Sequence, residues 1–190
     1  MSNPALAKRI FLTGFSGSGK STLAPLLAAR LGYACLDTDA ELEKKEGLPC
    51  AEIIRSKGLA CFRSLEESLI LALLDEDRCC VVALGGGAVT MEGMIPRLRQ
   101  GGLVVWVQVK LEEILDRLRS QNDRPLLQNK SVEEVQLFFR QREACYRQAA
   151  HLALDLSGLP PDSGADRLCR EVYSLVLPVP GEAPPRPASN

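Results

Sequence analysis

Nine consecutive residues near the N-terminus, Gly14 to Thr22, carry the clearest chemistry in this chain. Their sequence, GFSGSGKST, fits the phosphate-binding pattern G-x-x-x-x-G-K-[ST]. An apolar run precedes it and a helical pattern follows it, so the backbone amides and the helix N-terminus can point at phosphate oxygens. Lys20 can then reach the β- and γ-phosphates, and the Ser21 hydroxyl can ligate Mg²⁺. The alternative is a glycine-rich turn with a solvated lysine, but the context favours a nucleoside triphosphate site.

A second group of polar residues, Asp37-Thr38-Asp39, follows the next predicted strand. The period-two alternation of a strand predicts that Asp37 and Asp39 point to the same side. One carboxylate can serve the Mg²⁺ shell, and the other can accept a hydrogen bond from a substrate hydroxyl. The alternative is that Asp39 is an ordinary helix N-cap, and these residues alone do not decide between the two.

Three further features fit an acceptor site for a transferred phosphate. Gly85-Gly86-Gly87 follows a buried strand and exposes backbone amides to an anionic or hydroxylated ligand, although a loose turn is the alternative. Arg63, Arg142 and Tyr146 lie on predicted helices. An isolated helical arginine usually faces solvent, so each is only a candidate until others accompany it.

Strand and helix patterns alternate along the chain. The predicted strands are Arg9–Thr13, Tyr33–Asp37, Cys79–Leu84, Leu103–Val109 and Leu152–Leu156. The predicted helices are Lys20–Leu31, Asp39–Glu46, a helical pair near Cys50–Ser56 and Ala60–Leu74, Met94–Gln100, Leu111–Ser120, Ser131–Ala150 and Ser163–Leu177. This alternation predicts parallel crossovers in a doubly wound sheet, with ligands beyond the carboxyl ends of the strands.

Composition indicates one globular α/β domain over residues 1–177. Residues 178–190 contain five prolines and no periodicity, which predicts a disordered tail. The net charge of −1 favours neither nucleic acid nor an anionic membrane as a partner, and we found no apolar stretch of membrane-spanning length. We therefore expect a cytoplasmic protein.

Seven cysteines raise the question of a metal site or disulfides. No C-x-x-C pair occurs, and the single histidine, His151, has no ligand partner nearby in the sequence. We expect reduced and mostly buried thiols at all seven positions: Cys35, Cys50, Cys61, Cys79, Cys80, Cys145 and Cys169.

Six short motifs, taken in this order and at these spacings, closely resemble the shikimate kinases. They are GFSGSGKST, LDTD, GLACFRSLE, GGG, RPLL and REACY. The resemblance runs from about Arg9 to Leu177. It implies a three-layer α/β/α fold with a five-stranded parallel sheet, of the P-loop, nucleoside monophosphate kinase-like type, with a mobile lid near residues 121–130. It also implies transfer of the ATP γ-phosphate to the 3-hydroxyl of shikimate, on the pathway to chorismate and the aromatic amino acids.

The resemblance assigns roles position by position. The expected ATP-binding residues are Gly17, Ser18, Gly19, Lys20, Ser21, Thr22, Arg117, which would stack on adenine, and Arg124, which lies in the lid. The expected shikimate-binding residues are Asp39, Arg63, Gly86 and Arg142. Lys20, Asp39 and Arg124 are the expected catalytic residues, with Asp39 as the base. Ser21 would hold Mg²⁺, the implied cofactor, with Asp37 in its outer shell, and Glu66 would orient Arg63. The implied partners are ATP and shikimate, and the chain is expected to act as a monomer.

Two departures from the family pattern and two alternative functions remain. Leu59 stands where the family usually has Glu, and Leu159 where it often has a polar or basic residue near adenine. We expect the first to change packing rather than activity. A kinase of the same fold for gluconate or a nucleoside monophosphate is one alternative, because both arginines could also grip a phosphate. A non-catalytic, ATP-switched binding protein is the other.

Overall fold

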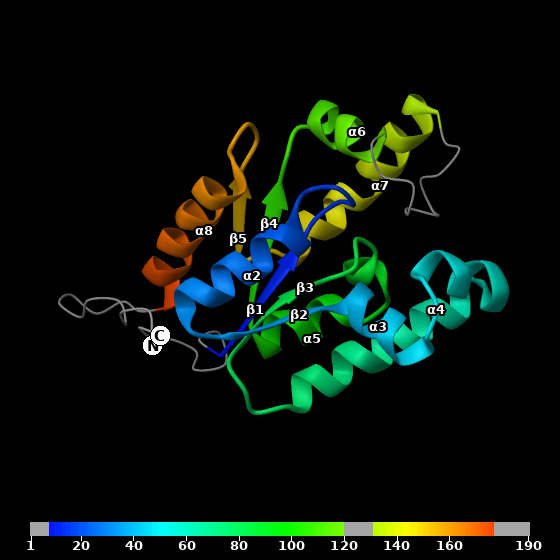
Figure 1. Cartoon of the computed structure of the whole chain (residues 1–190), viewed down its shortest axis with the longest axis horizontal. Coiled ribbons are helices and arrows are strands. Elements are labelled where there is room, and N and C mark those ends of the chain that lie inside the picture. The colour runs from blue at the N-terminus through cyan, green and yellow to red at the C-terminus, as the bar shows by residue number, and fades with distance from the viewer. Residues whose placement is uncertain (1–7, 120–130, 177–190) are drawn as a thin grey trace.

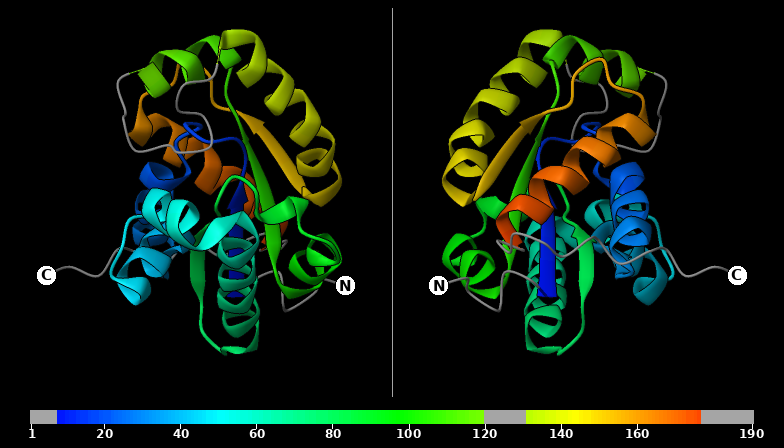
Figure 2. Two further views of the ribbon diagram at one scale, coloured as in Figure 1. Left: turned by 90° about the vertical axis from the view of Figure 1, so that its right-hand side faces the viewer. Right: turned by 90° about the vertical axis from the view of Figure 1, so that its left-hand side faces the viewer.

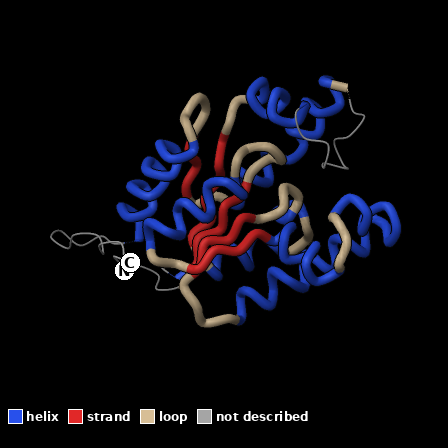
Figure 3. Tube along the Cα trace, in the orientation of Figure 1, coloured by secondary structure: helices blue, strands red, loops and turns tan. Residues whose placement is uncertain are grey.

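The computed structural model describes residues 8–119 and 131–176, and its core is a five-stranded parallel sheet. The strands are β1 (Arg9–Thr13), β2 (Ala34–Asp37), β3 (Cys80–Ala83), β4 (Leu103–Gln108) and β5 (Leu152–Asp155). Their spatial order is β2-β3-β1-β4-β5, and every neighbouring pair is parallel. Figure 3 shows the strands at the centre of the molecule with helices around them. The predicted doubly wound sheet is confirmed.

The helices form the outer layers. They are α2 (Lys20–Leu31), α3 (Thr38–Glu46), α4 (Cys50–Asp75), α5 (Met94–Gly101), α6 (Leu111–Arg119), α7 (Val132–Ala149) and α8 (Pro161–Val176), with a short 3₁₀ helix, η1, at Ala88–Thr90. The pair α2 and α8 packs together on one face of the sheet, and α5 and α7 pack together on the other (Figures 1 and 2). The three-layer α/β/α prediction is confirmed.

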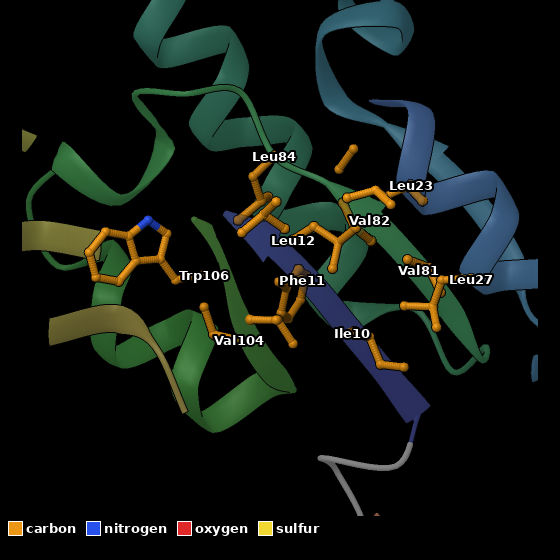
Figure 4. Packing of buried hydrophobic residues seen from close by; sticks show 14 of the residues in the cluster. Ile10, Phe11, Leu12, Leu23, Leu27, Val81, Val82, Leu84, Val104 and Trp106 are labelled. Carbon is orange, nitrogen blue, oxygen red and sulfur yellow. The ribbon is translucent and has the colours of Figure 1, made fainter. Parts of the chain in front are cut away.

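The main core surrounds the central strand, β1, all of whose residues are buried. Ile10, Phe11 and Leu12 pack between side chains of β3, β4 and α2 (Figure 4). A parallel strand that is covered on both faces has apolar side chains on both, so its sequence is a continuous apolar run, as it is in this segment. The buried sheet therefore gives a rigid base to the loops that leave its carboxyl edge.

A smaller apolar cluster joins α3 to α4. It consists of Leu42, Ile53 and Phe62. The two helical segments predicted here form one element that breaks at Gly58, whose φ of 84° and ψ of 159° are not helical. The break lets α4 turn back over α3, and the cluster fixes the two helices to each other.

The cysteine prediction is only partly correct. All seven cysteines are free thiols, but only Cys80 and Cys169 are buried. Cys35 and Cys79 are exposed. Cys35 lies on β2, which is an edge strand of the sheet, and that position could not be recognised from the local sequence pattern.

Candidate active site

The phosphate loop, Gly14–Thr22, connects β1 to α2 at the carboxyl edge of the sheet. Gly14 has a φ of 141°, and a Cβ there would lie 2.6 Å from the Val107 carbonyl oxygen, so a larger residue cannot occupy this position. Lys20 is buried, and its ammonium donates to the carbonyl oxygens of Gly14 at 2.8 Å and Phe15 at 2.9 Å. The first turn of α2 contains no acidic residue, so its positive end remains favourable for anions.

The two aspartates of the LDTD motif have different local roles. Asp37 ends β2 and caps α3, because its Oδ1 accepts from the amides of Asp39 at 3.0 Å and Ala40 at 3.3 Å. The N-cap of this helix is therefore Asp37, not Asp39. Asp39 lies in the first turn of α3, not on the strand. The prediction that the alternation of a strand points Asp37 and Asp39 to the same side therefore rested on the wrong element.

Thr38, between the two aspartates, ties α3 to the glycine loop. Its hydroxyl accepts from the Gly85 amide at 2.8 Å and lies 3.3 Å from the Ala83 carbonyl oxygen, to which it donates. Thr38 is fully buried. Its role was not predicted from the sequence, because the glycine loop that it contacts is distant along the chain.

The glycines of the GGG motif make room for side chains, which was not predicted either. A Cβ on Gly85 would overlap with a carboxylate oxygen of Glu66 and lie 2.7 Å from Oδ1 of Asp39. A Cβ on Gly87 would overlap with the guanidinium of Arg63. These three charged groups therefore converge on the backbone of the glycine loop.

Arg63 and Glu66 form an ion pair one turn apart on α4. The Glu66 side chain is fully buried, and burial raises the pKa of its carboxyl, an effect that the neighbouring Arg63 opposes. Its Oε2 accepts from Arg63, whereas its Oε1 has no hydrogen-bond partner among the described residues. The expected orientation of Arg63 by Glu66 agrees with this geometry.

Arg142 reaches the same loop from α7. Its guanidinium donates to the Gly86 carbonyl at 3.1 Å, and the Tyr146 hydroxyl donates to the same oxygen at 2.6 Å. The guanidinium also stacks 3.9 Å from the ring centroid of Phe138. Burial lowers the pKa of Arg142, and it raises the pKa of Tyr146 to about 12, so the phenol stays neutral near pH 7. Phe138 was not predicted, although its spacing of four residues from Arg142 is a signal that could have indicated it.

Two adjoining cavities occupy the carboxyl edge of the sheet. The first, of about 420 Å³, is lined by Gly17–Leu23 of the loop and α2, by Arg117, and by Leu159 to Pro161. The second, of about 300 Å³, is lined by Arg63, Glu66, Phe138, Arg142 and the glycine loop, among others. Both cavities are lined by the same four residues where they meet: Ser21, Asp37, Asp39 and Gly86. A group bound in one cavity can therefore meet a group bound in the other.

Arg117 and Leu159 belong to the first cavity. The Arg117 guanidinium donates to the Gly17 carbonyl at 3.1 Å and pairs with Glu113 at 3.3 Å. Leu159 offers an apolar surface to this cavity, and its amide is bonded to the Leu156 carbonyl oxygen. Leu59, the other departure, is 44% exposed and is not among the residues that line either cavity. Arg124 and the predicted lid at 121–130 lie outside the described residues, as does the predicted tail at 178–190.

The two residues expected to hold Mg²⁺ lie close to both cavities. Ser21 and Asp37 both line the junction of the two cavities. Within residues 8–119 and 131–176, no group of three or more His, Cys, Asp or Glu side chains is arranged to hold a metal ion. In phosphoryl-transfer sites, Mg²⁺ usually has only one or two protein ligands, and water and substrate phosphates complete its octahedron.

The fold, with its phosphate loop between β1 and α2 and two adjoining cavities at the carboxyl edge of the sheet, is that of a P-loop kinase with nucleoside monophosphate kinase-like architecture. A family model described as Shikimate kinase matches residues 16–173. The chain belongs to the shikimate kinase family, whose reaction is the ATP-dependent phosphorylation of shikimate.

Individual relatives extend this similarity over most of the chain. The shikimate kinase of Chlorobium luteolum is 35% identical over 192 residues, covering 94% of this chain and 94% of that protein. The shikimate kinase of Geobacter metallireducens is 39% identical over 159 residues, covering 83% and 88%. The solved structure of shikimate kinase from Acinetobacter baumannii in complex with shikimate superposes with a TM-score of 0.84 at 31% identity, covering 90% of this chain and 95% of that one.

Proposed function

We propose that this chain transfers the γ-phosphate of ATP to the 3-hydroxyl of shikimate, giving ADP and shikimate 3-phosphate. The observation that carries the proposal is the shared wall of the two cavities, formed by Ser21, Asp37, Asp39 and Gly86. Phosphoryl transfer needs a donor and an acceptor held in line, with charge stabilisation around the moving group. The shared wall supports this arrangement because it adjoins both binding volumes.

Two guanidinium groups would bind the shikimate carboxylate. Arg63 and Arg142 both line the acceptor cavity, and each is held by a contact within the protein. A planar guanidinium can pair with a carboxylate through two parallel hydrogen bonds. Because the two side chains are already oriented, little conformational entropy is lost when the acceptor binds.

Asp39 would bind the acceptor hydroxyl and take its proton. Its carboxylate lies beside Gly85, on the side of the acceptor cavity that adjoins the phosphate site. Lys20 would leave its present carbonyl partners to stabilise the phosphates of ATP, and Ser21 would hold Mg²⁺ with Asp37 nearby. The ion, when bound, neutralises charge on the β- and γ-phosphates. Arg124 completes the proposed catalytic set.

The test is a coupled assay of ADP release with purified full-length protein, ATP and Mg²⁺. We expect release that requires shikimate and Mg²⁺ together, with little turnover when gluconate or AMP replaces shikimate. Faster turnover with gluconate or AMP would contradict the proposed acceptor. ATP binding without turnover on any acceptor would instead favour a non-catalytic binding protein.

We propose that the protein acts as a monomer in the cytoplasm. Across the part of the chain that the structure describes, none of the helices is long and apolar enough to cross a membrane. Size-exclusion chromatography with light scattering measures the oligomeric state directly, and a dimer would contradict that part of the proposal.

A further inference from the structure

The first cavity, where the proposed reaction places ATP, has two sides that follow different strands. The phosphate loop follows β1, the central strand. Asp37 and Gly86, which the acceptor cavity shares, lie where β2 and β3 end, whereas Val109 and Leu156 follow β4 and β5 on the other side. A triphosphate that presents its γ-phosphate to the acceptor therefore places its base toward β4 and β5.

We call the side of the first cavity next to β4 and β5 the base end. It is lined by Val109, Arg117, Leu156, Leu159, Pro160, Pro161 and Gly164. Its accessible surface is mostly apolar, because Pro160 and Pro161 are exposed and Leu159 is only partly buried. Arg117, whose side chain is 40% exposed, is the charged residue among them. Its hydrogen bonds within the protein use the edge of the guanidinium, so a face can still stack on a flat ring.

Among the lining residues from Leu156 to Gly164, every backbone donor is used within the protein. The pairs, each from an amide to a carbonyl oxygen, are Leu156 to Gln108 at 2.9 Å, Leu159 to Leu156 at 3.2 Å and Gly164 to Pro160 at 2.9 Å. Pro160 and Pro161 have no N–H group. These lining residues therefore offer a nucleotide base no unused amide, and their side chains carry no polar atom.

Such a surface has consequences for the choice of nucleotide. Adenine differs from a 6-oxopurine by an amino donor in place of a carbonyl acceptor at the 6-position. A site that hydrogen-bonds one of these groups rejects the other base by about 10⁴–10⁵-fold, whereas an apolar site discriminates by about 10²-fold at most. Stacking depends little on the identity of the base, because every base has a π-face. The base end has the features of a site that discriminates weakly.

We propose, as an extension that rests on the proposed kinase reaction, that the base end binds a purine by stacking and apolar contact without reading its 6-position. The chain therefore accepts 6-oxopurine nucleotides, such as ITP, as phosphate donors alongside ATP. Leu159 determines this breadth, because a leucine side chain in the lining offers the base neither a donor nor an acceptor.

The first test compares ATP and ITP as donors, each with Mg²⁺ and shikimate. Mass spectrometry of shikimate 3-phosphate measures the product without depending on which nucleoside diphosphate is released. We expect the two values of kcat/KM to lie within about tenfold of each other, because the exchange at the 6-position changes neither the size nor the flatness of the ring. A larger preference for ATP would overturn the inference.

Two variants of one residue test the role of Leu159. The carboxylate of Leu159→Glu accepts from the amino group of adenine, so it should shift the ratio of the two kcat/KM values toward ATP by about fivefold or more. The ammonium of Leu159→Lys donates to the oxygen of a 6-oxopurine, so it should shift the ratio toward ITP. The matched controls are Leu59→Glu and Leu59→Lys, at an exposed leucine that lines neither cavity, and they should leave the ratio unchanged.

The ratio is measured with both donors on one protein sample, so a loss of folded enzyme in a variant cancels from it. Equal ratios in the wild type, Leu159→Glu and Leu159→Lys would contradict the role of Leu159. Calorimetric titration with ADP and with IDP supplies a readout without turnover, and we expect affinities within about tenfold of each other. Product from ATP without product from ITP would overturn this inference alone, whereas no product from either donor would contradict the proposed kinase reaction.

Discussion

At the scale of single residues, the charge of Asp39 is the feature on which the proposed chemistry depends most. Changing Asp39→Asn keeps the size of the side chain but removes the group that accepts the proton of the acceptor hydroxyl. We expect kcat to fall by about 10²–10⁴-fold, the usual contribution of a general base. Steady-state kinetics would measure this, and titration with a non-hydrolysable ATP analogue should show nearly unchanged affinity. Normal turnover in the Asp39→Asn variant would remove the proposed role.

Gly87 is the second residue whose chemistry is testable. Its backbone has φ −108° and ψ −2°, which alanine can adopt, but a Cβ would overlap with the Arg63 guanidinium. Gly87→Ala should therefore move Arg63 without straining the backbone. We expect the KM for shikimate to rise by roughly tenfold to a hundredfold. This is the loss of affinity expected when one hydrogen-bonded ion pair with the substrate is removed.

The comparison variant for Gly87→Ala is Arg63→Ala. The two should have similar kinetics, because both remove the guanidinium from its place against the glycine loop. The ATP affinity and the midpoint of thermal unfolding should change little in Gly87→Ala. A normal shikimate KM in this variant would mean that Arg63 does not need its present position to bind the acceptor.

At the scale of elements, the break in α4 should depend on a single glycine. Gly58 has φ 84° and ψ 159°, a region that is almost restricted to glycine, and a Cβ there would have open space around it. Gly58→Ala therefore tests backbone strain without a steric clash. We expect the free energy of unfolding to fall by about 1–3 kcal/mol, measured by urea denaturation.

Gly47, at the end of α3, provides the matched control for Gly58. It too has open space, but its φ of 68° and ψ of 15° lie in the left-handed helical region. Alanine enters that region at a cost of about 1 kcal/mol, so Gly47→Ala should be the milder variant. Equal losses in the two variants would contradict a special strain at the break.

Most elements could be predicted because their signals are local. The periodicity of β1 and α2 and the capping box of Ser131 and Glu134 gave bounds within a residue or two of the structure. The start of α8 was predicted two residues late, at Ser163, because Pro161 was not recognised as a residue suited to the first helical position. The three-residue helix η1 lacks any periodic signal and was missed.

At the scale of the whole molecule, the site exists because distant segments meet at one edge of the sheet. The strand order puts β3 between β1 and β2, so the glycine loop lies between the phosphate loop and Asp39. The family motifs indicated which residues belong together. They did not indicate the packing, such as Phe138 beneath Arg142 or carboxylates against glycine Cα atoms, because those contacts depend on tertiary geometry.

The same long-range packing predicts how overall stability depends on pH. His151, the one histidine in the sequence, accepts from the Val104 amide through Nδ1 at 3.0 Å and so links the segment before β5 to β4. Burial, assisted by Arg99, lowers the pKa of His151 below its ordinary 6.5. The unfolded chain therefore binds the proton more readily, and the free energy of unfolding should fall as the pH drops below about 6.5.

Urea denaturation between about pH 5 and pH 7.5 measures this dependence, since histidine is the side chain that ordinarily titrates there. The control variant is His151→Asn, whose amide oxygen can accept the Val104 amide without titrating. We expect the wild-type protein to lose stability toward pH 5 and the variant to lose distinctly less. Parallel curves for the two proteins would contradict the role of His151, because the loss would then come from carboxyl groups that both proteins share.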